Sequence, residues 1–299
     1  MPNITGDGNL TVSHKEFSAS PVLPSFSALN IFLSITATLG NALILIALQK
    51  VSSICPPRKL FFRCLAVTDL GVGLIVQPFY ATFLLSRLTK VSKNVVNALS
   101  WIFCAVSLLT LAAISVDRLL ALLLQLRYRQ AVTLWKVLVA AITIVLYNIA
   151  IGLIVFYNAR IAPTIVFIEV ILCTVISTFC YIKIYLALRR HQAQVQDHCH
   201  QVEANPGGTT LNMARYRKTV SSAVWVQMTL LACYLPYGIV SAMLVVKGSY
   251  TQSLSLASAA TFSLLLLNSS LNPLLYCWKM RVVRQAVKHT MRQVWCFPS

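Results

Sequence analysis

VLVAAITIVLYNIAIGLIVFYNA, residues 137–159, is a run of 23 residues without a single charged side chain. A helix needs about 20 consecutive apolar residues to cross the hydrocarbon core of a bilayer, which is about 30 Å thick. An uncharged run of this length therefore predicts a transmembrane helix. It decides the fold class, because further runs like it lie on both sides along the chain.

Seven stretches of this kind follow one another, and only Asp69 and Glu169 interrupt them with a charge. Their bounds are 22–49, 64–86, 94–116, 137–159, 161–182, 219–246 and 248–278. They predict an all-α membrane protein, a seven-transmembrane helix bundle over residues 22–278. An extracellular tail, 1–21, would precede the bundle. An amphipathic helix with a short cytoplasmic C-terminus, 279–299, would follow it.

The composition agrees with lipid as the solvent. Of the 299 residues, 58% are hydrophobic and 11% are charged, whereas a soluble domain carries about 25% charged residues. The net charge of +18 could indicate nucleic acid, but that reading requires a basic stripe on a soluble fold. The basic residues here lie between apolar runs, which favours anionic lipid headgroups as their partners and argues against nucleic acid.

The lysines and arginines also predict the orientation in the membrane. The segments that follow helices one, three, five and seven hold 19 of them, and the opposite side holds 6. The positive-inside rule therefore places the N-terminus outside the cell and the C-terminus in the cytoplasm of a multi-pass plasma-membrane protein. Asn3 and Asn9 begin glycosylation sequons in the outer tail. We expect no cleavable signal peptide, because the first residues lack a basic start and a short apolar core.

Two segments outside the spans are distinctive. Residues 191–214 are polar and contain Asn205-Pro206-Gly207-Gly208, so they are predicted to form a solvated loop between helices five and six. Residues 279–295 alternate apolar and basic residues at helical spacing, which is typical of a helix lying along the inner leaflet. Cys296 at its end is a candidate for palmitoylation, and an unmodified cysteine is the equal alternative.

Ionisable groups inside a bilayer are costly, so each one is a candidate functional residue. Asp69 lies at mid-depth in helix two, where the amides of Asn41, Asn268 and Asn272 could reach it. A buried carboxylate needs hydrogen-bond partners or a cation, and a water-bridged packing role is the alternative.

Asp117 and Arg118 come where helix three meets the cytoplasm. They fit either a snorkelling helix end or a switch in which Asp117 pairs with Arg118 and holds it in place. Pro78, Pro236 and Pro273 predict bends in helices two, six and seven, which serve as pivots or simply shape the packing.

Six short motifs, each at the appropriate end of its span, together resemble the rhodopsin-like family of G-protein-coupled receptors over about residues 33–295. They are Gly40-Asn41, Leu65-Ala66-Val67-Thr68-Asp69, Asp117-Arg118-Leu119, Tyr181-Ile182-Lys183-Ile184-Tyr185, Cys233-Tyr234-Leu235-Pro236-Tyr237 and Asn272-Pro273-Leu274-Leu275-Tyr276.

The resemblance implies roles for individual residues. Asp117 and Arg118 would form the activation switch, with Arg118 released to meet a heterotrimeric G protein. Asn272, Pro273 and Tyr276 would form the helix-seven part of that switch. Tyr181 would stabilise the open state alongside Tyr276, and Leu126 would dock into the G protein. A sodium ion, the one cofactor the family suggests, would be held by Asp69, Ser107, Asn268 and Asn272 and would favour the inactive state.

The ligand is an unknown extracellular molecule, and the candidate contacts are Ser100, Glu169, Tyr234 and Tyr237. Glu169 precedes Tyr181 by twelve residues, or about 18 Å of helix, which is the depth at which the family binds ligands. It could pair with a cationic or hydrogen-bond-donating ligand group, or it could be a neutral packing donor. Ser100 occupies the family's usual amine-anchor position, so an aminergic ligand is disfavoured.

Several departures from the family pattern point to a subgroup. None of the nine cysteines falls in a predicted outer loop, Cys173 stands where helix five often has a proline, and Tyr234 replaces the family's tryptophan. Such losses resemble the melanocortin, cannabinoid and lysophospholipid receptors. We expect no extracellular disulfide.

Other classes of membrane protein fit less well. A transporter would show an internal repeat with broken helices, and a light-sensing opsin would carry a lysine in helix seven, where Leu266 stands. An enzyme is not expected, because no histidine lies within a span to act as a base. The remaining alternative is a receptor-like orphan that is constitutively active or does not signal.

Overall fold

The computed structural model describes residues 21–51, 54–85, 90–158, 161–201, 207–247, 251–279 and 281–295. The described residues are almost entirely helical and include no β-strand. Seven helical segments among them are long and apolar enough to cross a membrane. They are α2 (Leu23–Lys50), α3 with η1 and α4 (Pro56–Leu84), α5 (Lys90–Leu124), α7 (Leu134–Tyr157), α8 (Ala162–Gln201), α9 (Gly207–Lys247) and α10 (Gln252–Lys279). The predicted seven-helix membrane bundle is confirmed.

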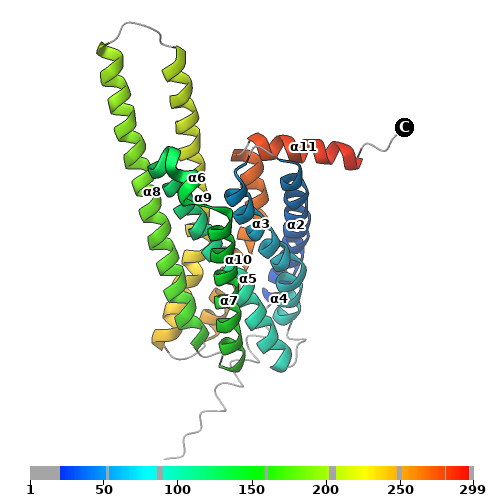
Figure 1. The fold of residues 1–299 in the computed structure, drawn as a ribbon. Coiled ribbons are helices and arrows are strands. Elements are labelled where there is room, and N and C mark those ends of the chain that lie inside the picture. The colour runs from blue at the N-terminus through cyan, green and yellow to red at the C-terminus, as the bar shows by residue number, and fades with distance from the viewer. Residues whose placement is uncertain are drawn as a thin grey trace, which may run out of the picture.

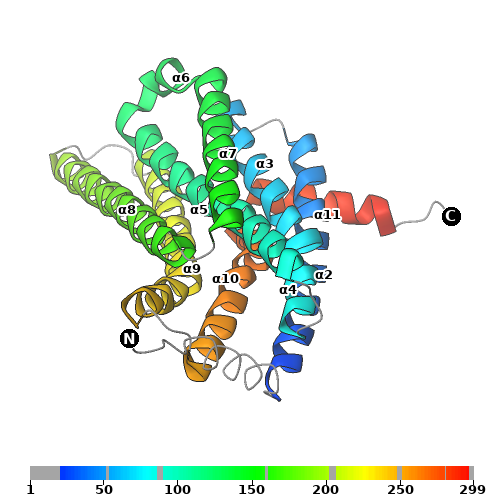
Figure 2. The ribbon, with the colours of Figure 1, turned by 90° about the horizontal axis from the view of Figure 1, so that it is seen from below.

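The helices stand side by side in one bundle, with α5 crossing its interior (Figures 1 and 2). α5 packs against α3, α7 and α8, while α2 packs against α3, α4 and α10. Large apolar side chains also cover the outside of the bundle, including Phe32, Leu39 and Leu146, each more than 60% exposed. Such a surface is stable only in lipid, so the exposed side chains agree with the transmembrane assignment.

The second span is continuous, although it changes its helical repeat in the middle. It consists of α3 (Pro56–Gly71), the π-helical turn η1 (Val72–Val76) and α4 (Gln77–Leu84). In η1 the wider turn lets the Gln77 N–H reach the Val72 carbonyl, just before Pro78, which has no N–H to donate. The predicted irregularity at Pro78 is therefore a π-turn.

Side-chain hydrogen bonds join α2 to α10 along several turns. Asn30 Nδ2 donates to Ser263 Oγ at 2.8 Å, and Asn41 Nδ2 donates to the Ser269 carbonyl at 2.9 Å. Near the second contact, Gly40 lets α2 approach the bend of α10, because a Cβ at Gly40 would lie 3.0 Å from Pro273 Cγ. The Gly40-Asn41 and Asn272-Pro273 motifs are thus neighbours in space.

After α10 the chain turns into α11 (Arg281–Trp295), which lies across one end of the bundle (Figure 1). Val283 and Val287 are buried against α2 and α10, and Arg284, Lys288 and Arg292 are exposed. The predicted amphipathic eighth helix is confirmed. We call this end of the bundle, where α2 and α5 finish and α11 begins, the basic end.

The predicted solvated loop over residues 191–214 is wrong for most of its length. α8 continues to Gln201 and α9 begins at Gly207, so that the pair projects well past the rest of the bundle (Figure 1). Helices satisfy their backbone hydrogen bonds internally, and a polar sequence is as compatible with a solvated helix as with a loop.

Among the residues that the structure describes, cysteines 55, 64, 104, 173, 180, 233 and 277 are free thiols. The candidate modification sites Asn3, Asn9 and Cys296 lie outside the described residues.

Candidate functional site

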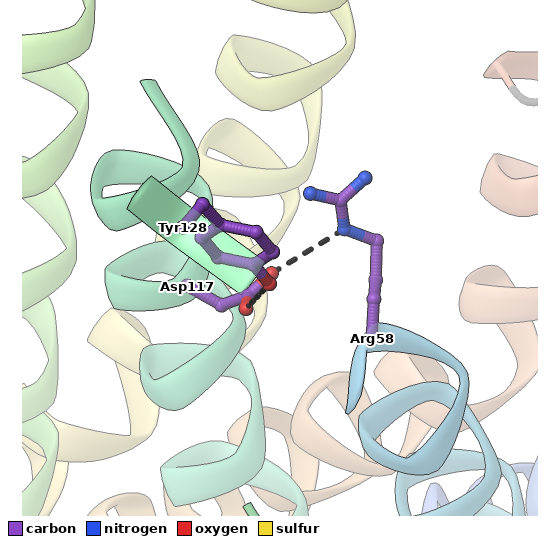
Figure 3. Close-up of polar contacts among 3 residues, drawn as sticks. All are labelled: Arg58, Asp117 and Tyr128. Carbon is purple, nitrogen blue, oxygen red and sulfur yellow. Dashed lines mark hydrogen bonds and ion pairs between the residues drawn. The ribbon is translucent and has the colours of Figure 1, made fainter. Parts of the chain in front are cut away.

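At the basic end, the carboxylate of Asp117 near the end of α5 has two partners from other elements (Figure 3). Arg58 of α3 approaches Asp117 Oδ2 with its Nε at 3.4 Å, and the Tyr128 hydroxyl donates to Asp117 Oδ1 at 2.5 Å. Tyr128 begins α6 (Tyr128–Ala131), the short helix that follows η2 (Gln125–Arg127). The Asp117 side chain is 2% exposed and the Arg58 side chain 22%, so this ion pair is largely shielded from solvent.

Tyr128 remains a hydrogen-bond donor at any physiological pH. Burial raises the pKa of its hydroxyl well above the ordinary value, and the hydrogen bond to the Asp117 carboxylate raises that pKa further. The contact therefore ties α6 to α5 with a charge-assisted hydrogen bond, which is about twice as strong as a neutral one.

Arg118 does not pair with Asp117, contrary to the switch arrangement considered from the sequence. Among the residues that the structure describes, the partners of the Asp117 carboxylate are Arg58 and Tyr128. The Arg118 guanidinium lies instead over the ring of Phe62, 6.0 Å from its centroid. In this arrangement the two adjacent side chains leave the helix in directions about 100° apart, and Arg58 and Tyr128 take the two oxygens of the Asp117 carboxylate.

Phe62 also contacts the helix-seven motif. Its ring packs edge-on against Tyr276, with centroids 5.2 Å apart. The Tyr276 side chain is buried, and its hydroxyl has no hydrogen-bond partner among the described residues. Phe62 thus lies between Arg118 and Tyr276, two residues that the sequence singled out separately. Phe62 could not be predicted from the sequence, because a phenylalanine in an apolar helix carries no distinctive signal.

The other residues predicted to act at the basic end lie nearby. The Ser115 hydroxyl donates to the Tyr181 hydroxyl at 3.2 Å, which links α5 to α8. Leu126 belongs to η2, although the structure does not describe its side chain. Gln125 precedes it with a φ of 42°, a left-handed conformation that is uncommon for a residue other than glycine.

In the middle of the bundle, Asp69 accepts hydrogen bonds from two of its predicted neighbours. Asn272 Nδ2 donates to Asp69 Oδ2 at 2.7 Å, and Ser107 Oγ donates to Asp69 Oδ1 at 3.1 Å. Asp69, Ser107 and Asn272 are all at most 2% exposed. The grouping of helices two, three and seven around this carboxylate therefore agrees with the sequence prediction.

The remaining predicted members of this cluster are arranged differently. Asn41 donates to α2 and α10 carbonyls rather than to Asp69, and Asn268 Nδ2 is buried without a partner among the described residues. The Ser269 hydroxyl is also within hydrogen-bonding reach of Asp69, so three of the carboxylate's roughly four lone-pair sites have a nearby donor. With the Ser107 hydroxyl beside it, Asp69 presents hard oxygen ligands that fit a small alkali cation.

Two of the ligand candidates, Tyr234 and Ser100, face the bundle interior. The Tyr234 hydroxyl reaches the Cys104 carbonyl of α5 at 3.5 Å and lies within hydrogen-bonding reach of Ser107. Ser100 is buried, and its hydroxyl has no partner among the described residues. Tyr234 therefore lies next to Ser107, one of the partners of Asp69. This proximity was not predicted from the sequence.

Tyr237 belongs to an aromatic group that joins three helices. Its ring lies 5.3 Å from that of Phe262, which packs edge-on against Tyr80 at 4.7 Å. Tyr80 and Phe262 come from α4 and α10, and the sequence analysis did not identify them as neighbours of Tyr237.

The Glu169 carboxyl group of α8 has a partner in α7. Its described side-chain partner is Tyr147 of α7, whose hydroxyl forms a hydrogen bond with the Glu169 carboxyl group. Glu169 is 6% exposed, and Oε1 has no partner among the described residues. A neutral packing role, the alternative to a ligand contact, would here involve helix four, because Tyr147 belongs to α7.

A seven-helix membrane bundle with an amphipathic eighth helix is the architecture of one class of protein, the seven-transmembrane receptors. The chain matches the profile of the family described as "7 transmembrane receptor (rhodopsin family)" over residues 40–164 and 154–276. It belongs to that family, and it is a multi-pass membrane receptor rather than an enzyme.

Individual relatives agree with this assignment. The adenosine receptor A3 of Ovis aries is 23% identical over 303 aligned positions, covering 92% of each chain. The melanocortin receptor 5 of the same species is 23% identical, covering 97% of this chain and 91% of its own. The histamine H2 receptor of Cavia porcellus is 32% identical over 146 positions, a match that spans 46% of this chain and only 40% of that receptor.

Proposed function

We propose that the protein is a cell-surface receptor that binds an extracellular ligand within the bundle and activates a heterotrimeric G protein at the basic end. The N-terminus would lie outside the cell and the basic end in the cytoplasm. The charge asymmetry supports this orientation, since Arg58, Arg118 and the arginines of α11 all belong to the basic end.

The observation that carries the proposal is the placement of Arg118. It lies near the end of α5, where it makes no described ion pair and its guanidinium contacts the ring of Phe62, a cation–π contact worth about 0.5–2 kcal/mol. A guanidinium held this weakly can exchange its contact for backbone carbonyls or carboxylates of a partner protein. Tyr181 and Tyr276 lie on the neighbouring helices α8 and α10, where they could support an opened basic end.

The ligand class stays open. The three relatives described above are named for three different ligands, so the comparisons do not favour one chemistry. Ser100, Glu169, Tyr234 and Tyr237 are the proposed contacts. Unpartnered polar atoms at Ser100 and Glu169 support this choice, because buried polar groups normally have hydrogen-bond partners.

A sodium ion would be held by Asp69 and Ser107, with Asn268 and Asn272 beside them. A bound cation would supply a positive charge that stabilises the closed arrangement of helices two, three and seven. In its absence, Ser107 and Asn272 orient the carboxylate by donating to its two oxygens.

The test is guanine-nucleotide exchange on a panel of purified G-protein heterotrimers with the full chain in lipid nanodiscs, combined with a ligand-library screen. The wild-type chain should promote exchange on at least one Gα class. Arg118→Ala should abolish exchange while surface expression stays near normal. Arg63→Ala, a change of another arginine near the basic end, is the matched control and should retain exchange. Exchange that persists in Arg118→Ala would contradict the mechanism, and no exchange by the wild-type chain with any ligand would favour a non-signalling receptor.

A further inference from the structure

We infer that Arg58 is a positioning residue that keeps Asp117 away from Arg118, so that Arg118 remains available to a G protein without an agonist. The inference rests on the proposed function. It starts from the ion pair between α3 and α5, in which the Arg58 Nε lies 3.4 Å from Asp117 Oδ2 (Figure 3).

Asp117 is the carboxylate within reach of Arg118. The two residues are adjacent, and their charges are close enough to attract each other. Rotation of both side chains could therefore bring the guanidinium to the carboxylate. Arg58 and Tyr128 oppose that rotation, because each occupies a different oxygen of Asp117.

Arg58 also acts on Arg118 directly. The two guanidinium groups are close enough for their positive charges to repel each other, and most of the Arg118 side chain is out of solvent, where screening is weak. Arg58 thus has two effects in the same direction. It competes for the carboxylate of Asp117, and it disfavours the approach of Arg118 to that carboxylate.

No second carboxylate is available from the neighbouring helix. α9, which spans Gly207–Lys247, contains neither aspartate nor glutamate anywhere in its sequence. An ion pair between α9 and Arg118 therefore cannot close the basic end. The described contact that remains to Arg118 is the ring of Phe62, 6.0 Å from the guanidinium carbon.

The arrangement predicts measurable agonist-independent exchange, and it predicts that removing Arg58 lowers it. When the Arg58 charge is lost, the Asp117 carboxylate loses the cation that competes with Arg118 for it, and Arg118 loses a repelling neighbour. The pair that then forms between Asp117 and Arg118 competes with the G protein for Arg118. Allosteric coupling energies of the usual size correspond to a reduction of about fivefold or more.

The experiment measures agonist-independent nucleotide exchange by the full chain in nanodiscs for wild type, Arg58→Ala, Arg58→Gln and Arg58→Lys. Ala and Gln should lower exchange, and Lys, which retains a charge for Asp117, should restore much of it. Arg63→Ala is the matched control, because Arg63 lies in the same helix and is not among the described partners of Asp117. Surface expression and thermal stability are measured for each variant.

The decisive comparison uses an Asp117→Asn background. If Arg58 acts through the Asp117 carboxylate, Arg58→Ala should cause no further change in exchange there, whatever the level of Asp117→Asn itself. An equal reduction in both backgrounds would overturn the inference, as would higher exchange in Arg58→Ala than in wild type. Failure of the proposed function would look different, since the wild-type chain would then promote no exchange with or without ligand.

Discussion

The rings of Trp225 and Trp278 lie 5.4 Å apart at an interplanar angle of 61°, in an edge-on contact between α9 and α10. Both side chains are about half exposed on the outside of the bundle. Tryptophan favours the level of the lipid headgroups, where its ring is half apolar and its N–H finds polar partners. The pair therefore joins helices six and seven at the membrane surface of the basic end.

We predict that Trp278→Leu raises agonist-independent G-protein activation. An edge-on aromatic pair contributes about 0.5–1.5 kcal/mol beyond the area it buries, and an outward movement of α9 would have to break it. Trp225→Leu should have the same effect. Because both substitutions break the same contact, the increase in the double variant should be smaller than the sum of the two single increases. The measurement is nucleotide exchange without ligand. Trp135→Leu is the control, because Trp135 is an exposed interfacial tryptophan of α7 without a described ring partner.

Asp69→Asn should remove any effect of sodium on agonist affinity. The substitution keeps the shape of the side chain, but it replaces one acceptor oxygen by an NH2 group, so that one of the bonds donated by Ser107 and Asn272 is lost or reversed, and it removes the charge that a cation needs. The measurement is agonist competition binding with sodium chloride against choline chloride at equal ionic strength. Ser263→Ala, which breaks the buried Asn30–Ser263 contact elsewhere in the bundle, should retain the sodium effect. A sodium effect that survives Asp69→Asn would place the ion at another site.

Tyr276→Phe should leave thermal stability unchanged and reduce coupling. The Tyr276 hydroxyl is buried without a described partner, so its removal costs no hydrogen bond in this arrangement. Tyr80→Phe is the contrasting variant, because the Tyr80 hydroxyl donates to the Ala259 carbonyl at 3.3 Å. Its removal should lower stability by about 1 kcal/mol. Thermal unfolding in detergent and nucleotide exchange are both measured, and a clear loss of stability in Tyr276→Phe would contradict the prediction.

The number and order of the helices could be predicted from the sequence because charged residues are so costly in lipid. The seven apolar runs hold at most one aspartate or glutamate each, so they stand out clearly from the rest of the sequence. The ends of the helices were less predictable beyond the membrane. The segment from His191 to Gln201 is polar, and for a polar segment in water a helix and a loop differ little in free energy; α8 continues through it as a helix.

The hydrogen-bond partners of a site residue could be predicted only where residues of several helices lie at the same depth in the membrane. Asn272 and Ser107 meet Asp69 because depth within each helix brings them to the same level. The partner of Asp117 was not predictable, since Arg58 is 59 residues away and only the packing of α3 against α5 brings it close. Adjacency in sequence pointed to Arg118 instead, although neighbouring residues on a helix point apart.

Glu169 presents the clearest choice between a ligand anchor and a packing group. Tyr147 hydrogen-bonds the carboxyl group from α7, and Oε1 is left without a partner in a buried position. An orphaned buried acceptor costs about 1–3 kcal/mol. A ligand that donates to Oε1 would remove this cost, whereas a packing role needs only the contact with Tyr147.

We therefore expect Glu169→Gln to weaken ligand binding strongly and Tyr147→Phe to affect it little. A desolvated charge pair with a cationic ligand group is worth about 2–5 kcal/mol, and Gln keeps the size of the side chain without the charge. Tyr147→Phe removes only the hydrogen bond from the lipid-facing side and leaves Oε1 available to the ligand. Both variants are compared in saturation binding and in thermal unfolding, using whichever ligands the library screen identifies. If Glu169→Gln keeps every affinity within about twofold of wild type, a difference of about 0.4 kcal/mol, Glu169 is not an anchor. A shared loss of stability in the two variants would then assign the carboxyl group to the packing of α7 against α8.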